Sequence, residues 1–247
     1  MAEFDAYSDS YTQAIRDATA FVGQQPEGFT RRKTDALIDL VRRRLGELHK
    51  TRVLDVGCGP GETDRVLGDR FLELHGVDVS SEMVARAMET NPWATYASYA
   101  EAGQLPYDEG DFDLAFAICV FHHVAPAGRA HLMREMVRVT RPGGLVVIFE
   151  HNPLNPLTRK VVRNCVFDKD AILLGRREVS GLFRETDLDP VESRYILFVP
   201  SESPRTRAVE RSLAWLPLGA QYYAAARKPE NARARQAAPE PPGSRPM

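Results

Sequence analysis

The chain has 247 residues, of which 43% are apolar, and a formal net charge of −2 at pH 7. This length and composition fit one compact globular domain with a sizeable core. The near-neutral charge provides no broad positive field for a phosphate backbone, so nucleic acid is not expected as a partner. The longest apolar run, residues 114–121, is far shorter than the roughly 20 residues that cross a bilayer, so no membrane contact is expected.

The three cysteines, Cys58, Cys119 and Cys165, are too few and too scattered for a disulfide framework or a zinc site. We interpret them as reduced thiols and predict a cytoplasmic protein. The histidines, cysteines and acids show no metal-ligand spacing in the sequence, so no metal is expected. Acyl and phosphoryl transfer lack their usual signatures, since the sequence has no GxSxG motif and no Walker lysine.

The first fifty residues predict a helical segment, with a helix from about Thr34 whose apolar side chains share one face. From Val53 onward strands and helices alternate, as in a parallel sheet covered on both faces. The expected strands are 53–56, 74–78, 95–99, 113–119, 145–149, 194–199 and 221–226. The last two lack a crossover helix between them, which favours an antiparallel pair. The predicted fold is α/β: a Rossmann-like, doubly wound, mostly parallel seven-stranded sheet with an antiparallel edge strand.

Residues 152–176 are the one stretch that this alternation does not require. Pro153 and Pro156 are expected to prevent an immediate helix there. An insertion at the carboxyl edge of a sheet usually shapes a pocket. Residues 229–247 are rich in Pro, Arg and Ala without apolar periodicity, and they are expected to be disordered.

The most informative stretch is residues 53–62, VLDVGCGPGE, which places glycines at 57, 59 and 61 after a short apolar strand. Glycine adopts positive φ without penalty and has no Cβ to keep a ligand away from the backbone N–H groups. The stretch therefore predicts a ligand cradle at the end of a buried strand. Its GxGxG spacing, followed by Glu62, departs from the GxGxxG of dinucleotide-binding units, and a carboxylate there is unfavourable beside a diphosphate.

With this turn, an acid at Asp78, the segment AICVFHHV and an RPGG turn before the fifth strand, the chain resembles the class I S-adenosylmethionine-dependent methyltransferases of the small-molecule, type 11-like kind. The resemblance implies S-adenosylmethionine as methyl donor and S-adenosylhomocysteine as product. It also implies three parts: residues 1–50 as a helical cap over the cofactor and substrate site, residues 51–228 as the cofactor-binding domain, and the insertion at 152–176 as the part that shapes the substrate pocket.

The resemblance places the cofactor against the ends of the first four strands. Asp78, about twenty residues beyond the glycine turn, is placed to accept hydrogen bonds from a ribose diol. The aromatic N-terminal region resembles one that folds over the cofactor, where a ring face attracts a sulfonium. The expected cofactor-binding residues are Tyr11, Asp55, Gly57, Gly59, Gly61, Asp78, Val79, Met83, Ala100, Glu101 and Cys119. Core packing is an alternative for Met83, and Arg31 or Arg32 is a candidate for the cofactor carboxylate.

Polar side chains at the ends of the fourth and fifth strands form the opposite rim. A neutral imidazole accepts a proton from an attacking hydroxyl or amine near pH 7, so His122 and His123 are candidate catalytic residues. Glu150 is the third, as a base or as an orienting carboxylate. The candidate substrate-binding residues are Tyr7, His151 and Asn152. Backbone capping or core packing is the alternative for each histidine.

Together these features predict transfer of a methyl group, by in-line displacement, to an O, N or C nucleophile of a small molecule such as a secondary metabolite (EC 2.1.1.-). A monomer or homodimer is expected. The segment 117–121 lacks the Asn/Asp-Pro-Pro-aromatic pattern of enzymes that methylate nucleobase amines. Two alternatives remain: a module that binds S-adenosylmethionine without catalysis, and a nicotinamide-dependent oxidoreductase, which the glycine spacing disfavours.

Overall fold

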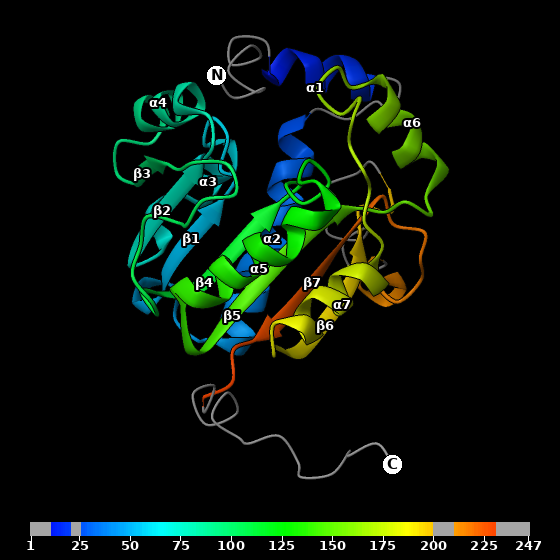
Figure 1. The fold of residues 1–247 in the computed structure, drawn as a ribbon. Coiled ribbons are helices and arrows are strands. Elements are labelled where there is room, and N and C mark those ends of the chain that lie inside the picture. The colour runs from blue at the N-terminus through cyan, green and yellow to red at the C-terminus, as the bar shows by residue number, and fades with distance from the viewer. Residues whose placement is uncertain (1–10, 21–25, 200–209, 231–247) are drawn as a thin grey trace, which may run out of the picture.

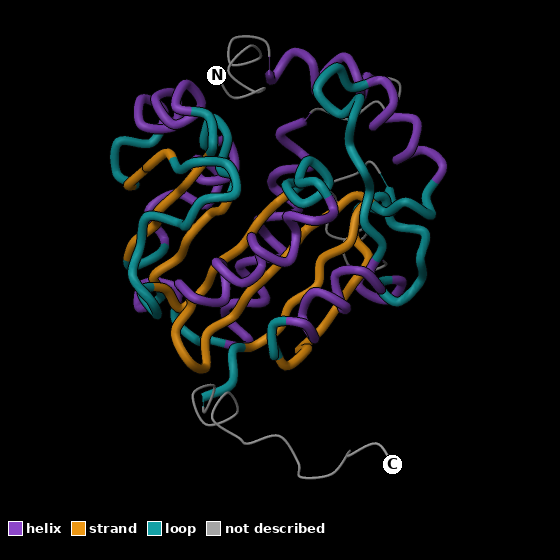
Figure 2. Tube along the Cα trace, viewed as in Figure 1, coloured by secondary structure: helices purple, strands orange, loops and turns teal. Residues whose placement is uncertain are grey.

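The computed structural model describes residues 11–20, 26–199 and 210–230. Figure 1 shows a twisted sheet with helices on both faces, and Figure 2 shows the same view by secondary structure. The strands are β1 (Arg52–Val56), β2 (Glu73–Asp78), β3 (Thr95–Ser98), β4 (Phe112–Ile118), β5 (Thr140–His151), β6 (Asp189–Ile196) and β7 (Gln221–Arg227). The α-helices are α1 (Tyr11–Thr19), α2 (Pro26–Arg44), α3 (Glu62–Leu67), α4 (Ser81–Thr90), α5 (Pro126–Val139), α6 (Pro156–Asn164) and α7 (Arg176–Glu185). Two 3-10 helices, η3 (Leu48–Lys50) and η4 (Gly68–Arg70), complete the list.

The sheet has the strand order β3-β2-β1-β4-β5-β7-β6. The first five strands pair in parallel, and β7 runs antiparallel to both of its neighbours, β5 and β6. The predicted fold class is therefore confirmed, with the reversed strand lying one position in from the edge. β6 begins at Asp189, earlier than predicted. The sequence does not reveal this start because the side chains of β6 are mostly half-buried and show little apolar alternation.

Both faces of the sheet are buried, which explains the near-continuous apolar strands. On one face Leu54 and Ile148 pack with Met133 of α5 and Phe183 of α7. On the other face neighbouring strand residues such as Val147 pack against α2. Figure 1 shows α5 and α7 in front of the sheet and α2 behind it. Helix α2 is thus part of the sheet's covering layer, and only its N-terminal part reaches the carboxyl edge of the strands.

Two local features of the structure differ from the predictions. The RPGG sequence lies inside β5 as an irregularity, since the pairing with β4 jumps from Phe112–Thr140 to Leu114–Leu145. The expectation that Pro156 prevents a helix is wrong. Pro156 is instead the first residue of α6, a position where proline loses no hydrogen bond, and Asn155 caps the helix by accepting the N–H groups of Leu157 and Thr158.

The insertion contains α6, which packs against α1. Ala18 of α1 packs against Cys165 and Phe167, and Figure 1 shows α1 beside α6.

The C-terminal tail is predicted to be disordered, and its residues from 231 onward lie outside the described part. No helix in the described ranges is long and apolar enough to cross a membrane.

Candidate active site

The carboxyl ends of β1, β4 and β5 open into a cavity of about 260 Å³. The glycine turn forms one wall, through Asp55, Gly57 and Gly59. Gly57 has φ +78°, and a Cβ there would lie 2.4 Å from a methyl carbon of Val120, so no other residue fits. At Gly59 the space that a Cβ would occupy is open, so a ligand can lie against the backbone there. Gly61 caps α3 and does not line the cavity.

Asp78 braces the turn from the end of β2. Its two carboxylate oxygens accept the backbone N–H groups of Gly59 and Ser80, each at 2.9 Å. The side chain is buried and does not line the cavity. Asp78 therefore fixes the shape of the cradle, and its contact with a ribose stays a prediction.

The remaining predicted cofactor residues divide between the cavity and its surroundings. Cys119 lines the cavity, at φ +59°, immediately after β4. Met83 is fully buried in α4, whereas Ala100 and Glu101 are exposed beyond β3 and Val79 is half-buried. Those four residues do not line the cavity, and their adenine contacts are untested. Tyr11 begins α1, but its side chain, like the whole of Tyr7, lies outside the described residues.

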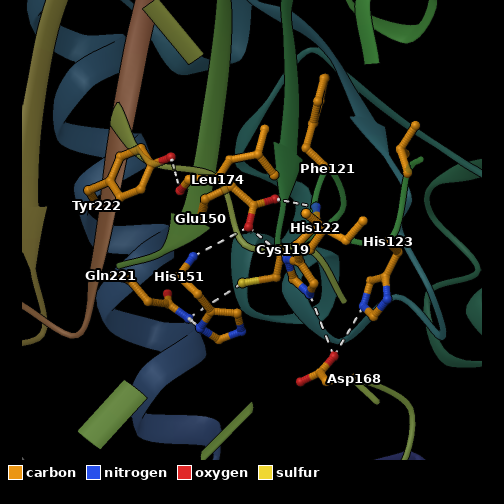
Figure 3. Close-up of polar contacts among 12 residues, drawn as sticks. Cys119, Phe121, His122, His123, Glu150, His151, Asp168, Leu174, Gln221 and Tyr222 are labelled. Atoms are coloured by element: carbon orange, nitrogen blue, oxygen red, sulfur yellow. Dashed lines mark hydrogen bonds and ion pairs between the residues drawn. The ribbon is translucent and has the colours of Figure 1, made fainter. Parts of the chain in front are cut away.

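The opposite wall carries a cluster of histidines and carboxylates, drawn in Figure 3. Strands β4 and β5 are parallel and Ile118, the last residue of β4, pairs with Phe149, which brings the segment after β4 beside the last residues of β5. Nδ1 of His122 lies 2.6 Å from Oε2 of Glu150, and both side chains are buried. The Glu150 carboxylate also accepts the backbone N–H groups of His122 and His151 at 3.3 Å. Glu150 thus stands behind His122, which lines the cavity.

The pKa shifts of the two residues favour an ion pair between them. Burial alone would lower the pKa of His122, but the adjacent Glu150 carboxylate and hydrogen bonding with Asp168 raise the pKa to about 10. Burial alone would raise the pKa of Glu150, but the His122 charge and hydrogen bond lower it below its ordinary range. His122 is therefore expected to carry a proton at neutral pH.

Asp168, from the insertion, joins the cluster, although no motif in the sequence marks it. Its Oδ1 lies 3.5 Å from Nε2 of His122 and 3.2 Å from Nε2 of His123. Burial would raise the pKa of Asp168, but the two histidines hold the pKa well below its ordinary value. An acid in an insertion without periodicity looks the same in the sequence as the exposed Asp170 nearby, so no local pattern distinguishes it.

His151 lies beside this group, with its ring centroid 5.0 Å from that of His122. Burial and the charge of His122 lower the pKa of His151 to about 4, so its ring is neutral. Gln221 donates through Nε2 to Nδ1 of His151 at 3.3 Å and to the sulfur of Cys119 at 3.4 Å. We assign the ring proton to Nε2, because Nδ1 accepts this hydrogen bond.

Two further polar residues have structural roles that the sequence does not reveal. The Asn152 amide donates to the carbonyls of Pro217 and Gly219 at 3.0 and 2.8 Å, and the residue does not line the cavity. Arg129 of α5 donates to carbonyls on both sides of the cluster, in the FHHV segment and at Ile172. These contacts hold the insertion and the histidine segment together.

The cation that lines the cavity from α2 is Lys33. Arg32, one of the two arginines predicted for the cofactor carboxylate, is buried and bound instead to Glu210 and to the carbonyl of Val199. Neither Arg31 nor Arg32 lines the cavity, and a contact of either with the cofactor carboxylate stays a prediction.

The matched domain and the fold indicate a class I S-adenosylmethionine-dependent methyltransferase. Residues 54–148 match the model of a family described as "Methyltransferase domain". Among curated proteins the chain is similar to 27-O-demethylrifamycin SV methyltransferase of Amycolatopsis mediterranei, with 34% identity over 49% of this chain and 45% of that protein. It is also similar to 2-methyl-6-phytyl-1,4-hydroquinone methyltransferase of Synechocystis, with 33% identity over 46% and 38% of the two chains. The similar region spans less than half the length of these two relatives.

Solved structures share the fold at low identity. A methyltransferase from Haloferax volcanii, in complex with the Trm112 methyltransferase activator, aligns with a TM-score of 0.64 and 19% identity over 93% of this chain and 99% of that one. The [4+2]-cyclase SpnF aligns with a TM-score of 0.56 and 20% identity over 79% and 81%. Because a cyclase has the same fold, the fold alone does not establish methyl transfer. The family does imply S-adenosylmethionine as the methyl donor.

Proposed function

We propose that this chain transfers a methyl group from S-adenosylmethionine to a nucleophile of a small apolar molecule, such as a secondary metabolite. One observation carries the proposal: a single cavity has the glycine cradle on one wall and the histidine cluster on the other. Donor and acceptor bound there would lie side by side. Alignment of two bound reactants is worth up to about 7 to 11 kcal/mol of the barrier.

The cradle fits the charges of the cofactor. Oδ1 of Asp55 is buried and has no hydrogen-bond partner among the described residues, which suits the cofactor's ammonium group. Lys33 on the facing helix suits its carboxylate, and the open space at Gly59 admits the ligand to the backbone. When bound, S-adenosylmethionine supplies an electrophilic methyl group on a sulfonium. The chain's own residues then orient the two reactants and exclude water.

We assign control of the acceptor's proton to His122, His123 and Glu150. Glu150 fixes the ring of His122 through Nδ1, so that Nε2 points toward the cavity. The His123 side chain is 21% exposed, against 1% for His122, so an entering acceptor meets His123 first. His151, neutral and protonated at Nε2, is proposed as a hydrogen-bond donor to the acceptor. Asn152 acts on the acceptor only through the loop that it holds.

The other cavity walls are apolar and match an acceptor with a hydrocarbon or ring body. They are formed by α1, α2, the insertion and the segment after β6, through side chains such as Phe29, Leu157, Val161, Phe167 and Leu197. The names of the curated relatives include an O-demethylated rifamycin and a phytyl hydroquinone. An apolar hydroxyl compound is therefore the acceptor that we propose first. Cytoplasmic location and a monomer or homodimer remain predictions from the sequence.

Methyl transfer is tested by incubating the protein with methyl-labelled S-adenosylmethionine and a panel of phenols, hydroquinones, amines and activated carbon acids. The expected result is S-adenosylhomocysteine together with an equal amount of labelled product from a hydroxyl compound. Binding of S-adenosylhomocysteine without transfer to any acceptor of the panel favours the non-catalytic module. Binding of NAD in place of S-adenosylhomocysteine favours the oxidoreductase.

A further inference from the structure

Ligand atoms of two histidines and one aspartate converge at the cavity wall opposite the glycine turn (Figure 3). One ring nitrogen each of His122 and His123 and a carboxylate oxygen of Asp168 all lie within 4.8 Å of one another. The histidines follow β4, while Asp168 arrives from the insertion. The group therefore exists only in the folded chain, which is why the spacing of the sequence does not reveal it.

The two separations between Asp168 and the histidines also leave room for an ion between the groups. The distances from Oδ1 of Asp168 to Nε2 of His122 and of His123 are 3.5 and 3.2 Å. Both exceed the ~2.7–2.9 Å of a charge-assisted hydrogen bond. Both are close to the edge, about 3.4 Å, of a tetrahedron whose centre lies about 2.1 Å from each nitrogen or oxygen ligand, as around zinc.

Glu150 supplies the carboxylate that usually accepts a hydrogen bond from the second ring nitrogen of a metal-binding histidine. Such a histidine donates its second ring N–H to a carboxylate or carbonyl, which fixes the ring and the tautomer. Nδ1 of His122 has this contact with Glu150 at 2.6 Å. Glu150 and Asp168 are also two carboxylates at 0% and 7% exposure, and buried carboxylates are stabilised by a cation beside them.

We propose that His122, His123 and Asp168 bind a divalent transition-metal ion of the zinc, cobalt or iron(II) class, with Glu150 orienting His122. Two imidazoles and one carboxylate suit this class, whereas magnesium and calcium prefer oxygen ligands alone. Three protein ligands leave a coordination position open, and all three residues line the cavity. The role of the ion rests on the proposed function: a bound ion would hold the acceptor oxygen and make its hydroxyl more acidic, in place of proton transfer to His122 or His123.

The test uses the full chain, treated with a chelator, dialysed and titrated with Co²⁺ and with Zn²⁺. We expect one ion per chain by calorimetry, and visible absorption of a four- or five-coordinate Co²⁺ site. Asp168→Asn should weaken binding at least about 100-fold, and Glu150→Gln about 10- to 100-fold. Asp170→Asn is the matched control, because Asp170 lies two residues further along the same segment and is exposed. It should bind both ions as the unaltered chain does.

Absence of one-to-one binding of either ion overturns the inference, and so does equal affinity in Asp168→Asn and the unaltered chain. Titration of each variant with S-adenosylhomocysteine checks that the cavity is intact. The two proposals fail separately. If the chain binds no Co²⁺ and its methyl transfer is unchanged after chelation, the proposed function is supported and the metal site is rejected. If the chain binds Co²⁺ but transfers no methyl group, the metal site is supported and the proposed function is rejected.

Discussion

Nδ1 of His122 lies 2.6 Å from Oε2 of Glu150, although 28 positions separate the two residues in the chain. The contact follows from the parallel pairing of β4 and β5, whose carboxyl ends bring both residues to the same edge. It fixes one nitrogen of the ring and leaves the other toward the cavity. The orientation of His122 therefore depends on a side chain that does not itself line the cavity.

Replacement of Glu150 tests this dependence. Glu150→Gln keeps the shape of the side chain but removes the negative charge that stabilises the orientation of His122. We expect kcat for methyl transfer to fall on the order of 10²- to 10⁴-fold, the usual contribution of proton transfer by a positioned side chain. Calorimetry should show unchanged affinity for S-adenosylhomocysteine. A variant that binds the cofactor and turns over at the unaltered rate would remove Glu150 from the site.

Asp78 is expected to support cofactor binding both by bracing Gly59 and by accepting a ribose hydroxyl. Asp78→Ala should weaken binding of S-adenosylhomocysteine by about 1.5 to 3 kcal/mol, the value of a hydrogen bond to a charged group. Asp78→Asn keeps an oxygen for one backbone N–H and should lose less. Glu82→Ala, at an exposed acid in the first turn of α4, is the control. Equal affinity in a folded Asp78→Ala chain contradicts the assignment.

Lys33 is expected to bind the carboxylate of the cofactor. Lys33→Met keeps most of the apolar stem and removes the charge, so affinity for S-adenosylhomocysteine should fall about tenfold, close to the 1.5 kcal/mol lower value of a charged hydrogen bond. Lys33→Arg should recover part of the loss. Lys50→Met is the matched control, since Lys50 is the last residue of the predicted N-terminal cap and its side chain is 70% exposed. A similar loss in both methionine variants argues against a specific contact.

Two buried carboxyl groups behind the glycine turn make stability depend on pH. Burial raises the pKa of Asp64 to about 7, and burial with the neighbouring charge of Asp64 raises the pKa of Asp55 well above its ordinary value. Between about pH 4 and 7 the folded state therefore binds more protons than the unfolded chain. This contribution to stability is complete below about pH 4 and is lost as the pH rises through about 7.

Asp64→Asn removes one titrating group and keeps an oxygen for the Tyr96 hydroxyl, which donates to Asp64 at 2.9 Å. We expect the unaltered chain, without cofactor, to lose on the order of 2 kcal/mol of unfolding free energy between about pH 5 and 8, and the variant to lose less. Urea denaturation across this range measures both. Asp69→Asn, at an exposed aspartate, controls for the surface charge. Parallel profiles for Asp64→Asn and the unaltered chain would refute the assignment.

The sequence predicts those parts of the molecule that depend on local chemistry. Apolar runs and glycines mark the strands and the turn at Gly57 and Gly59, and parallel topology brings His122 and Glu150 to one edge. The path of the insertion depends on tertiary contacts instead, such as those of Arg129 with the carbonyl of Ile172. The convergence of Asp168 on the histidines therefore has no counterpart in spacing or periodicity.

The most direct test of the account is calorimetry of S-adenosylhomocysteine and of NAD with the unaltered chain and with Gly59→Asn. Asparagine tolerates the φ of +53° at this position, so the variant fills the cradle without forcing the backbone. Gly46→Asn places the same residue at another positive φ, beyond α2 and outside the cavity lining. We expect one-to-one binding of S-adenosylhomocysteine to the unaltered and Gly46→Asn chains, no binding to a folded Gly59→Asn chain, and no binding of NAD. Equal binding of S-adenosylhomocysteine to all three chains, or binding of NAD, would contradict this expectation.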